Sequence, residues 1–205
     1  MPRLSFRTKH WSCPLTCRRC SFKKANGLVC KNNVCLGLPF CSAHNSVQFG
    51  VRIKPSTIAK AGKGLFATRD ISKDAWVCPY VGELLNMRCV NKRYPGRMTA
   101  PYTELLPGPG GLAVDAACTR GIGSLANARI KKDGTVASLG RHNCKASYRP
   151  VGDGIPGIWL KATKTIRQGE EVFLYYGEGG YLLEDTHSTD RRANVVDSRP
   201  CKATK

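Results

Sequence analysis

The chain has 205 residues, of which 41% are hydrophobic, and it carries a formal net charge of +19 at pH 7. This length fits one domain of ordinary size with a small appendage, and the apolar content excludes a chain that is disordered throughout. No apolar run approaches the length of a membrane span, so we expect no membrane partner.

The positive charge is unevenly distributed along the chain. No Asp or Glu precedes Asp70, whereas Lys and Arg are frequent in that first third. A surface of one sign attracts polyanions, and the simplest polyanionic partner is nucleic acid. The alternative is a basic surface that only keeps the protein soluble.

Cysteine and histidine are crowded into residues 1–48. Six of the eleven cysteines lie between Cys13 and Cys41, and the start of the chain lacks the apolar segment of a signal peptide. We therefore expect a reducing compartment, where clustered cysteines bind metal; three disulfides, or a transit peptide at the Arg-rich start, are the alternatives. The candidate zinc ligands are Cys13, Cys17, Cys20, Cys30, Cys35, Cys41 and His44, with His10 as a further one.

Two short spacings suggest how these ligands are shared between ions. A gap of two residues, as in Cys17–Cys20 and Cys41–His44, lets both side chains reach one tetrahedral zinc ion from a single turn. These two pairs predict one four-ligand site, and the remaining candidates predict a second. Because residues 1–48 have too few large apolar residues to fold unaided, structural zinc would stabilise this module and hold its basic residues rigidly for contacts with phosphate.

Short strands and one short helix are predicted after this module. Alternating or apolar stretches predict strands at 51–54, 65–68, 75–81, 101–105 and 158–162, and a short helix is predicted between 86 and 96. Turns rich in glycine and proline separate them, most clearly at 61–64 and 107–111. The pattern predicts a β-rich α+β fold.

The residues that carry chemistry fall into short segments along the chain. In order, these segments are 62–67 (GKGLFA), 80–83 (YVGE), 114–116 (VDA), 121–127 (GIGSLAN), 142–144 (HNC) and 169–177 (GEEVFLYYG). In this order and at these separations they resemble the SET domain, the fold of protein-lysine methyltransferases, over residues 51–181. The resemblance implies a β-clip fold with a knot-like crossing of strands. It divides the chain into a zinc-binding module (1–48), a SET domain (49–181) and a flexible tail (182–205).

By this resemblance the chain binds S-adenosylmethionine and methylates lysine. The implied cofactor-binding residues are Gly62, Lys63, Gly64, Phe66, Tyr102, Asn127, Ala128 and Tyr176. The implied catalytic residues are Tyr176 and Tyr80, and the lysine channel is lined by Tyr80, Leu174 and Tyr181. Leu174 stands where the family often has a larger aromatic residue, so we expect a pocket that admits methylated lysine and gives di- or trimethylation.

The chain departs from the family pattern in three places. Ala128 replaces a histidine that acts in the family largely through its backbone. An insertion at 130–141 separates the segment 121–127 from His142 and Asn143, which align with a Pro-Asn pair. The zinc-binding Cys-x-Cys segment that follows many SET domains is missing, so residues 179–183 would cover the lysine channel instead.

Acidic residues just after the predicted catalytic tyrosine suggest the substrate. Glu178, Glu184 and Asp185 would attract a lysine-rich segment, with a solvated turn as the alternative. We therefore expect a histone as substrate, nucleosomal DNA as the partner of the basic module, and a nuclear location. One alternative is another basic protein as substrate, with the cytoplasm as location. Another is a SET fold that has lost catalysis and binds chromatin.

Overall fold

The computed structural model describes residues 7–8, 11–12, 18–34, 39–59, 61–94, 103–107, 111–117, 121–129, 131, 137–150 and 157–177. Several predicted functional residues lie outside these ranges, as does the tail at 182–205. They are His10, Cys13, Cys17, Cys35, Tyr102, Glu178, Tyr181, Glu184 and Asp185, together with residues 130 and 132–136 of the insertion.

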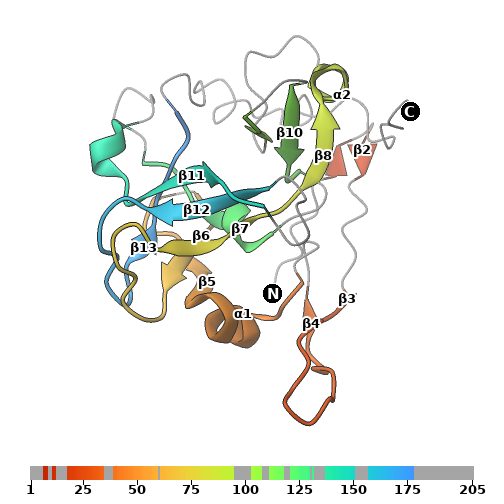
Figure 1. The fold of residues 1–205 in the computed structure, drawn as a ribbon, viewed down its shortest axis with the longest axis vertical. Helices are drawn as coiled ribbons and strands as arrows, with labels where there is room; N and C mark the ends of the chain where they lie inside the picture. Colours follow the sequence, from red (N-terminus) through yellow and green to blue (C-terminus); the bar gives the residue numbers. More distant parts are fainter. Residues whose placement is uncertain are drawn as a thin grey trace.

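The described chain is made of short strands and few helices, so the predicted β-rich α+β fold is confirmed (Figure 1). The strands are β1 (Arg7–Thr8), β2 (Trp11–Ser12), β3 (Arg18–Arg19), β4 (Asn33–Val34), β5 (Val51–Pro55), β6 (Lys63–Ala67), β7 (Trp76–Tyr80), β8 (Glu83–Asn86), β9 (Thr103–Leu105), β10 (Leu112–Asp115), β11 (Cys144–Tyr148), β12 (Ile158–Ala162), β13 (Glu171–Val172) and β14 (Leu174–Tyr175). The helices are α1 (Ser42–Phe49) and α2 (Met87–Arg93), with short 3-10 helices η1 (Ile122–Leu125) and η2 (Leu139–Arg141). None of the helices in the described ranges is long and apolar enough to cross a membrane.

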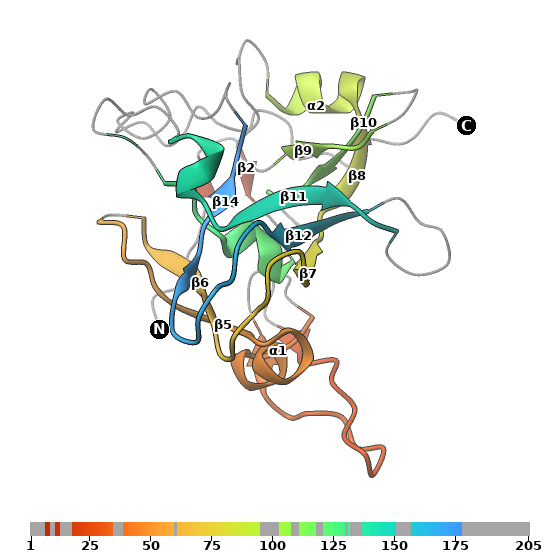
Figure 2. The same ribbon diagram turned by 60° about the vertical axis from the view of Figure 1, so that its left-hand side comes forward.

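Three small sheets enclose the main hydrophobic core. Their strand orders are β14–β11–β12–β7, β13–β6–β5 and β8–β10–β9. In β12, Ile158, Leu160 and Ala162 are buried and alternate with less buried residues, which is the pattern of a strand with one face on a core. Figure 2 shows α2 with the β8–β10–β9 sheet at one end of the molecule, and α1 with the β3–β4 hairpin at the other.

Strands β5, β6, β7, β9 and β12 overlap the predicted strands, and α2 is the predicted short helix. The strand β8 was not predicted because Leu84 and Leu85 are adjacent and hide the alternation. In the sheet Leu85 is buried, whereas Leu84 is 49% exposed. A side chain next to a buried neighbour in a strand points to the opposite face, even when both are leucine.

The last described residues of the chain pass through the predicted knot-like crossing of strands. Phe173 forms a parallel bridge with Asn127, and Leu174 pairs in parallel with Cys144, so residues 171–174 lie between two earlier segments. The Asn143 side chain holds them there: Nδ2 donates to the Glu171 carbonyl at 2.8 Å, and Oδ1 accepts from the Phe173 N–H at 2.7 Å. A buried amide that satisfies two backbone groups fixes both the position and the direction of the crossing strand.

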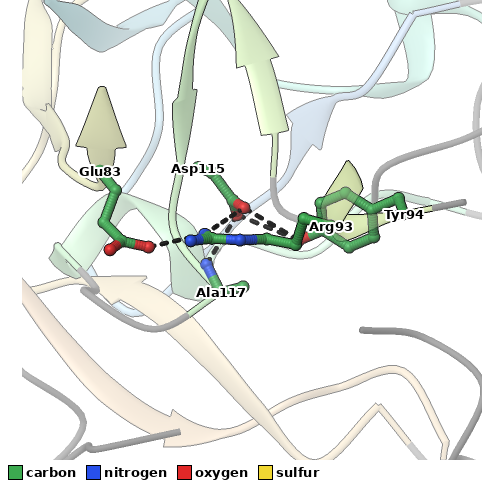
Figure 3. Close-up of polar contacts among 5 residues, drawn as sticks. All are labelled: Glu83, Arg93, Tyr94, Asp115 and Ala117. Atoms are coloured by element: carbon green, nitrogen blue, oxygen red, sulfur yellow. Dashed lines mark hydrogen bonds and ion pairs between the residues drawn. The ribbon is translucent and has the colours of Figure 1, made fainter. Parts of the chain in front are cut away.

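A buried ionic cluster attaches α2 to its sheet (Figure 3). The Arg93 guanidinium contacts Glu83 at 2.6 Å and Asp115 at 2.7 Å. Asp115 is fully buried, and it also accepts hydrogen bonds from the Tyr94 hydroxyl at 3.1 Å and the Ala117 N–H at 2.9 Å. Because the carboxylate has several donors and a cation, its charge is compensated despite complete burial.

Replacing Arg93 by leucine should destabilise the fold by about 3–5 kcal/mol, since it leaves the Asp115 carboxylate buried without its cation. The measurement is urea-induced unfolding of the whole chain, followed by circular dichroism. Arg88→Leu is the matched control, because Arg88 lies exposed on the same helix. Equal losses of stability in the two variants would contradict the importance of the buried pair.

Candidate functional site

The phenol of Tyr176 lies beside the backbone that precedes Asn127. Its hydroxyl donates a hydrogen bond to the Ala126 carbonyl at 2.7 Å. Tyr176 is half-buried and packs against the core cluster that contains Tyr80 and Leu174, which are both buried. The structure thus places both predicted catalytic tyrosines and one predicted channel residue in or against one core cluster.

Asn127 and the glycine turn form a second group of predicted site residues. Asn127 Nδ2 donates to the Lys63 carbonyl at 3.0 Å and to Glu171 Oε1 at 3.1 Å. Nδ2 also lies 3.1 Å from the Ser56 hydroxyl oxygen. No donor within the described ranges bonds Asn127 Oδ1, so this oxygen is available as an acceptor. Ala128 follows directly and is buried.

The turn at 62–64 needs glycine for two separate reasons. Gly62 has a φ of 75°, in the left-handed region that side chains disfavour. A Cβ atom on Gly64 would collide with Glu171 Oε1, so a side chain there would displace the hydrogen-bonded Glu171 carboxylate. The Lys63 side chain between them is exposed, which leaves its carbonyl as the part of the residue that faces Asn127.

Glu171 connects this turn to the crossing strand. Its carboxylate accepts hydrogen bonds from the Ser56 hydroxyl at 2.7 Å and the Thr57 N–H at 2.7 Å, in addition to the bond from Asn127. Burial acts against ionisation, but these donors outweigh it and lower the pKa of Glu171 below its ordinary value. Glu171 was part of the sequence motif, but its role as the anchor of the glycine turn was not predicted.

Phe66 lies in a different environment from the other predicted cofactor residues. It is buried on β6, and the Lys54 ammonium lies 4.7 Å from its ring centroid. Its ring lines a cavity together with Phe173 and Arg129, whereas Lys63, Asn127 and Tyr176 are not part of that lining.

His142 takes a structural role that the sequence did not predict. Its imidazole is 1% exposed; Nε2 accepts from the Arg129 N–H at 2.9 Å, and Nδ1 lies 3.0 Å from the Ser138 carbonyl. These bonds require a neutral ring that donates from Nδ1. Burial, with the charges of Arg129 and Lys164, lowers the pKa of His142 and keeps the ring neutral. The ring thereby ties the two ends of the insertion together, directly after Asn127 and Ala128.

Glu104 is a further ionisable group that no motif marked. It lies on β9 opposite Val114 of β10, so the two side chains share one face of the sheet. Val114 belongs to the same core cluster as Tyr80. Burial raises the pKa of Glu104 to about 7. Since no cation pairs with it in the described part of the chain, this carboxyl is a candidate group for receiving a cationic substrate.

Four predicted metal ligands meet at the start of α1. The ligand atoms of Cys20, Cys30, Cys41 and His44 all lie within 4.8 Å of one another. Cys41 is the N-cap of α1 and His44 lies in its first turn, which puts their side chains on one ion as the two-residue gap predicted. The predicted sharing of ligands was wrong for Cys30. It was assigned to the second zinc site, but its thiol lies with Cys20, Cys41 and His44. The β3–β4 segment folds back and delivers Cys30, a contact that spacing does not reveal.

The chemistry of this cluster fits zinc. His44 Nδ1 lies 3.4 Å from Cys20 Sγ and 3.3 Å from Cys41 Sγ, and the Phe22 ring stacks on the imidazole at 3.9 Å. Despite burial, hydrogen bonds from Asn32 and the His44 backbone lower the pKa of Cys41 to about 6. Three thiols and one imidazole are a common structural zinc set. Cys20, Cys30 and Cys41 are free thiols, so the disulfide alternative does not hold for them, whereas Cys89 is disulfide-bonded.

Comparison with known proteins gives a consistent result. The SET domain family model matches residues 62–177. A solved structure of Polycomb Repressive Complex 2 from Chaetomium thermophilum, bound to S-adenosylmethionine, is 27% identical with a TM-score of 0.50, covering 67% of this chain and 16% of its own. A second structure of that complex, bound to trimethylated histone H3, is 26% identical with a TM-score of 0.52, covering 71% and 16%.

The methyltransferase domain of human PR domain-containing protein 2 is 21% identical with a TM-score of 0.46, covering 66% of this chain and 83% of its own. No curated protein sequence matches the chain. The chain thus spans only about a sixth of the length of the Polycomb subunit that it resembles, at 16% coverage.

Replacing Cys30 by serine should remove one equivalent of zinc from the purified chain, because a closed four-ligand site then has one thiolate fewer. The measurement is metal content by mass spectrometry of the protein after gel filtration. Cys78→Ala is the control, since Cys78 is buried in the main core and belongs to no ligand cluster in the described residues. Unchanged zinc in Cys30→Ser would refute the four-ligand assignment.

Replacing Glu104 by glutamine should change how stability depends on pH. The raised pKa means that the folded chain holds a proton which the unfolded chain loses above its ordinary value of 4.5. The contribution of Glu104 is therefore fully present below pH 4.5 and is lost as the pH rises through about 7. We expect the melting temperature of the variant to exceed that of the wild type increasingly between pH 5 and 8. Parallel curves would contradict this.

Proposed function

Because the chain belongs to the SET-domain family, with residues 62–177 matched, we propose that it is a protein-lysine methyltransferase acting on a histone in chromatin. The observation that carries the proposal is the position of the Tyr176 hydroxyl, 2.7 Å from the Ala126 carbonyl and next to Asn127. The site thus combines a phenol, a backbone oxygen and the glycine turn at 62–64, all held by the crossing strand. The solved neighbour bound to S-adenosylmethionine supports the methyl donor.

The residues around Asn127 suit the amino-acid end of the donor. Asn127 Oδ1 and the Lys63 carbonyl are two acceptors that would hold its ammonium group, and Gly62 and Lys63 are exposed, which leaves room for it. Ala128 would present its backbone to the adenosine. S-adenosylmethionine, when bound, supplies a methyl group on a positively charged sulfur. The chain's own groups therefore need to bind, orient and desolvate, and not to form a covalent intermediate.

Tyr176 and Ala126 would polarise the reacting region. Their two oxygens present negative partial charge, which favours polarised C–H groups and a positively charged centre. Buried Tyr80 and Leu174 would form the walls of a narrow channel that holds the lysine amine in line. A free lysine has a pKa of about 10.4, so its deprotonation near pH 7.4 costs about 4 kcal/mol, and an apolar channel reduces that cost.

The histone target rests on charge and on the neighbours' ligands. The Polycomb complex is solved with trimethylated histone H3, which supports a lysine-bearing protein substrate in general. Glu104 offers a carboxyl to a cationic substrate. On the metal-binding module, the exposed side chains of Arg19, Lys23, Lys24 and Lys31 would contact nucleosomal DNA, and the protein would then act in the nucleus.

Replacing Tyr176 by phenylalanine should lower methyl transfer at least about 100-fold, since it removes a hydroxyl aimed at the reacting region without removing the ring. The measurement is transfer of labelled methyl from S-adenosylmethionine to nucleosomes, free histones and a non-histone protein extract. Tyr175→Phe is the matched control, because its hydroxyl makes no hydrogen bond within the described residues. Mass spectrometry of the product gives the methylation state, which we expect to be di- or trimethyl because Leu174 leaves space.

The outcomes separate the candidate functions. Label in nucleosomes that disappears in Tyr176→Phe supports the histone enzyme. Label only in the extract would move the substrate to another basic protein. No label with any substrate, despite a folded chain, would leave a SET fold that binds chromatin without catalysis.

A further inference from the structure

A cavity of about 410 Å³ lies on the outer face of β6 and β13. It adjoins the group around Lys63 and Asn127, because Glu171 lines the cavity and also accepts a hydrogen bond from Asn127. Its lining residues are Thr57, Phe66, Arg129, Arg141, Asn143, Lys164, Thr165, Gly169, Glu170, Glu171 and Phe173. Of the predicted site residues, Phe66 takes part in this lining, whereas Tyr80, Leu174 and Tyr176 do not. The cavity therefore needs its own explanation.

Three cations from separate segments converge on this cavity. The Arg129 guanidinium lies over the Phe173 ring, 4.1 Å from its centroid, which holds it at the cavity wall. The Lys164 ammonium donates to the Gly140 carbonyl at 3.2 Å, next to Arg141. All three side chains are exposed at the rim, and none forms an ion pair within the described ranges.

The two carboxylates at the cavity already accept hydrogen bonds from neutral groups. Glu171 already accepts hydrogen bonds from Ser56, Thr57 and Asn127. Glu170 accepts from the Arg167 N–H at 2.8 Å. The cations of the cavity also affect the neighbouring buried His142. Burial and the charges of Arg129 and Lys164 together lower the pKa of this histidine. Three cations against two carboxylates leave the lining of the cavity with a net positive charge.

The insertion that departs from the family pattern contributes to this site. Arg129 directly precedes the insertion and Arg141 is its last residue, and the buried His142 ring joins the two segments through the Arg129 N–H and the Ser138 carbonyl. The ring thereby fixes the backbone next to both arginines on one wall. The third cation, Lys164, lies outside the insertion, after β12.

We propose that this cavity binds a phosphate group of a nucleic-acid backbone. Arginine binds phosphate through two parallel N–H groups, and lysine adds a point charge, so three such residues around one opening match a phosphate oxygen cluster. The rim position of the cations allows a continuous backbone to pass, and the net charge of +19 favours a polyanion over a small anion. The site deepens the proposed contact with nucleosomal DNA and rests on that contact, but not on methyl transfer.

The test is the salt dependence of binding to a fluorescent DNA duplex, measured by anisotropy with the whole chain. The cavity variant is Arg129→Gln, Arg141→Gln and Lys164→Gln together. The matched control is Lys73→Gln, Arg88→Gln and Lys145→Gln, which removes the same charge from exposed positions in the turn before β7, on α2 and on β11, none of which lines the cavity. We expect the slope of log affinity against log salt to fall by about 0.9 for each phosphate that the cavity variant no longer neutralises, and by less in the control.

Several outcomes would overturn the proposal. Equal slopes in the two triple variants would show that only total charge matters. Tighter competition by adenosine monophosphate than by unlabelled duplex would make the cavity a free-nucleotide site. Loss of S-adenosylmethionine binding in the cavity variant would assign the cavity to the methyl-donor site. Arg141→Gln alone, whose side chain is exposed at the rim, gives the same test at smaller amplitude if the triple variant does not fold.

For the cavity variant we expect weakened binding to DNA and unchanged methylation of a short lysine-rich peptide. It also distinguishes this proposal from the enzymatic one. Absence of peptide methylation in the wild type would remove the proposed enzyme and leave the DNA result unaffected.

Discussion

The hydrogen bonds of one buried amide determine the geometry of the site. Asn143 donates to the Glu171 carbonyl and accepts from the Phe173 N–H, so it holds residues 171–174 between two earlier segments. From that position Glu171 reaches the glycine turn, Leu174 enters the core, and Tyr176 arrives at the Ala126 carbonyl. A strand held by backbone bonds alone could slide by one residue, which would exchange the faces of all these side chains.

The buried charges around this crossing are compensated in two different ways. Glu171 is stabilised by neutral donors, whereas Asp115 is paired with a buried arginine and a tyrosine hydroxyl. Both carboxylates connect elements that are far apart in sequence, and both would be costly if left alone in an apolar core. Short strands can often be arranged in several ways that bury similar amounts of apolar surface. Polar networks of this kind favour one of these arrangements, because only that one satisfies all the buried groups.

Local patterns allowed the fold and much of the site to be predicted. The glycine turn, Asn127 and Tyr176 each belong to a short motif, and the described structure places these segments side by side. Long-range contacts could not be predicted, because spacing carries no information on which loop folds back. Cys30 was assigned to the wrong zinc site for this reason, and His142 was predicted only as the neighbour of Asn143. The environment of Glu104 also depends on a cross-strand partner that no motif marks.

Calorimetric titration of the zinc-loaded whole chain with S-adenosylmethionine tests most directly whether the crossing builds a methyl-donor site. If it does, one molecule should bind per chain, and Asn143→Ala should bind far more weakly than the wild type, because the segment that carries Glu171 and Tyr176 is no longer fixed. A folded wild-type chain that binds no S-adenosylmethionine would contradict the assignment. Equal affinity in the two proteins would show that Asn143 does not control the site.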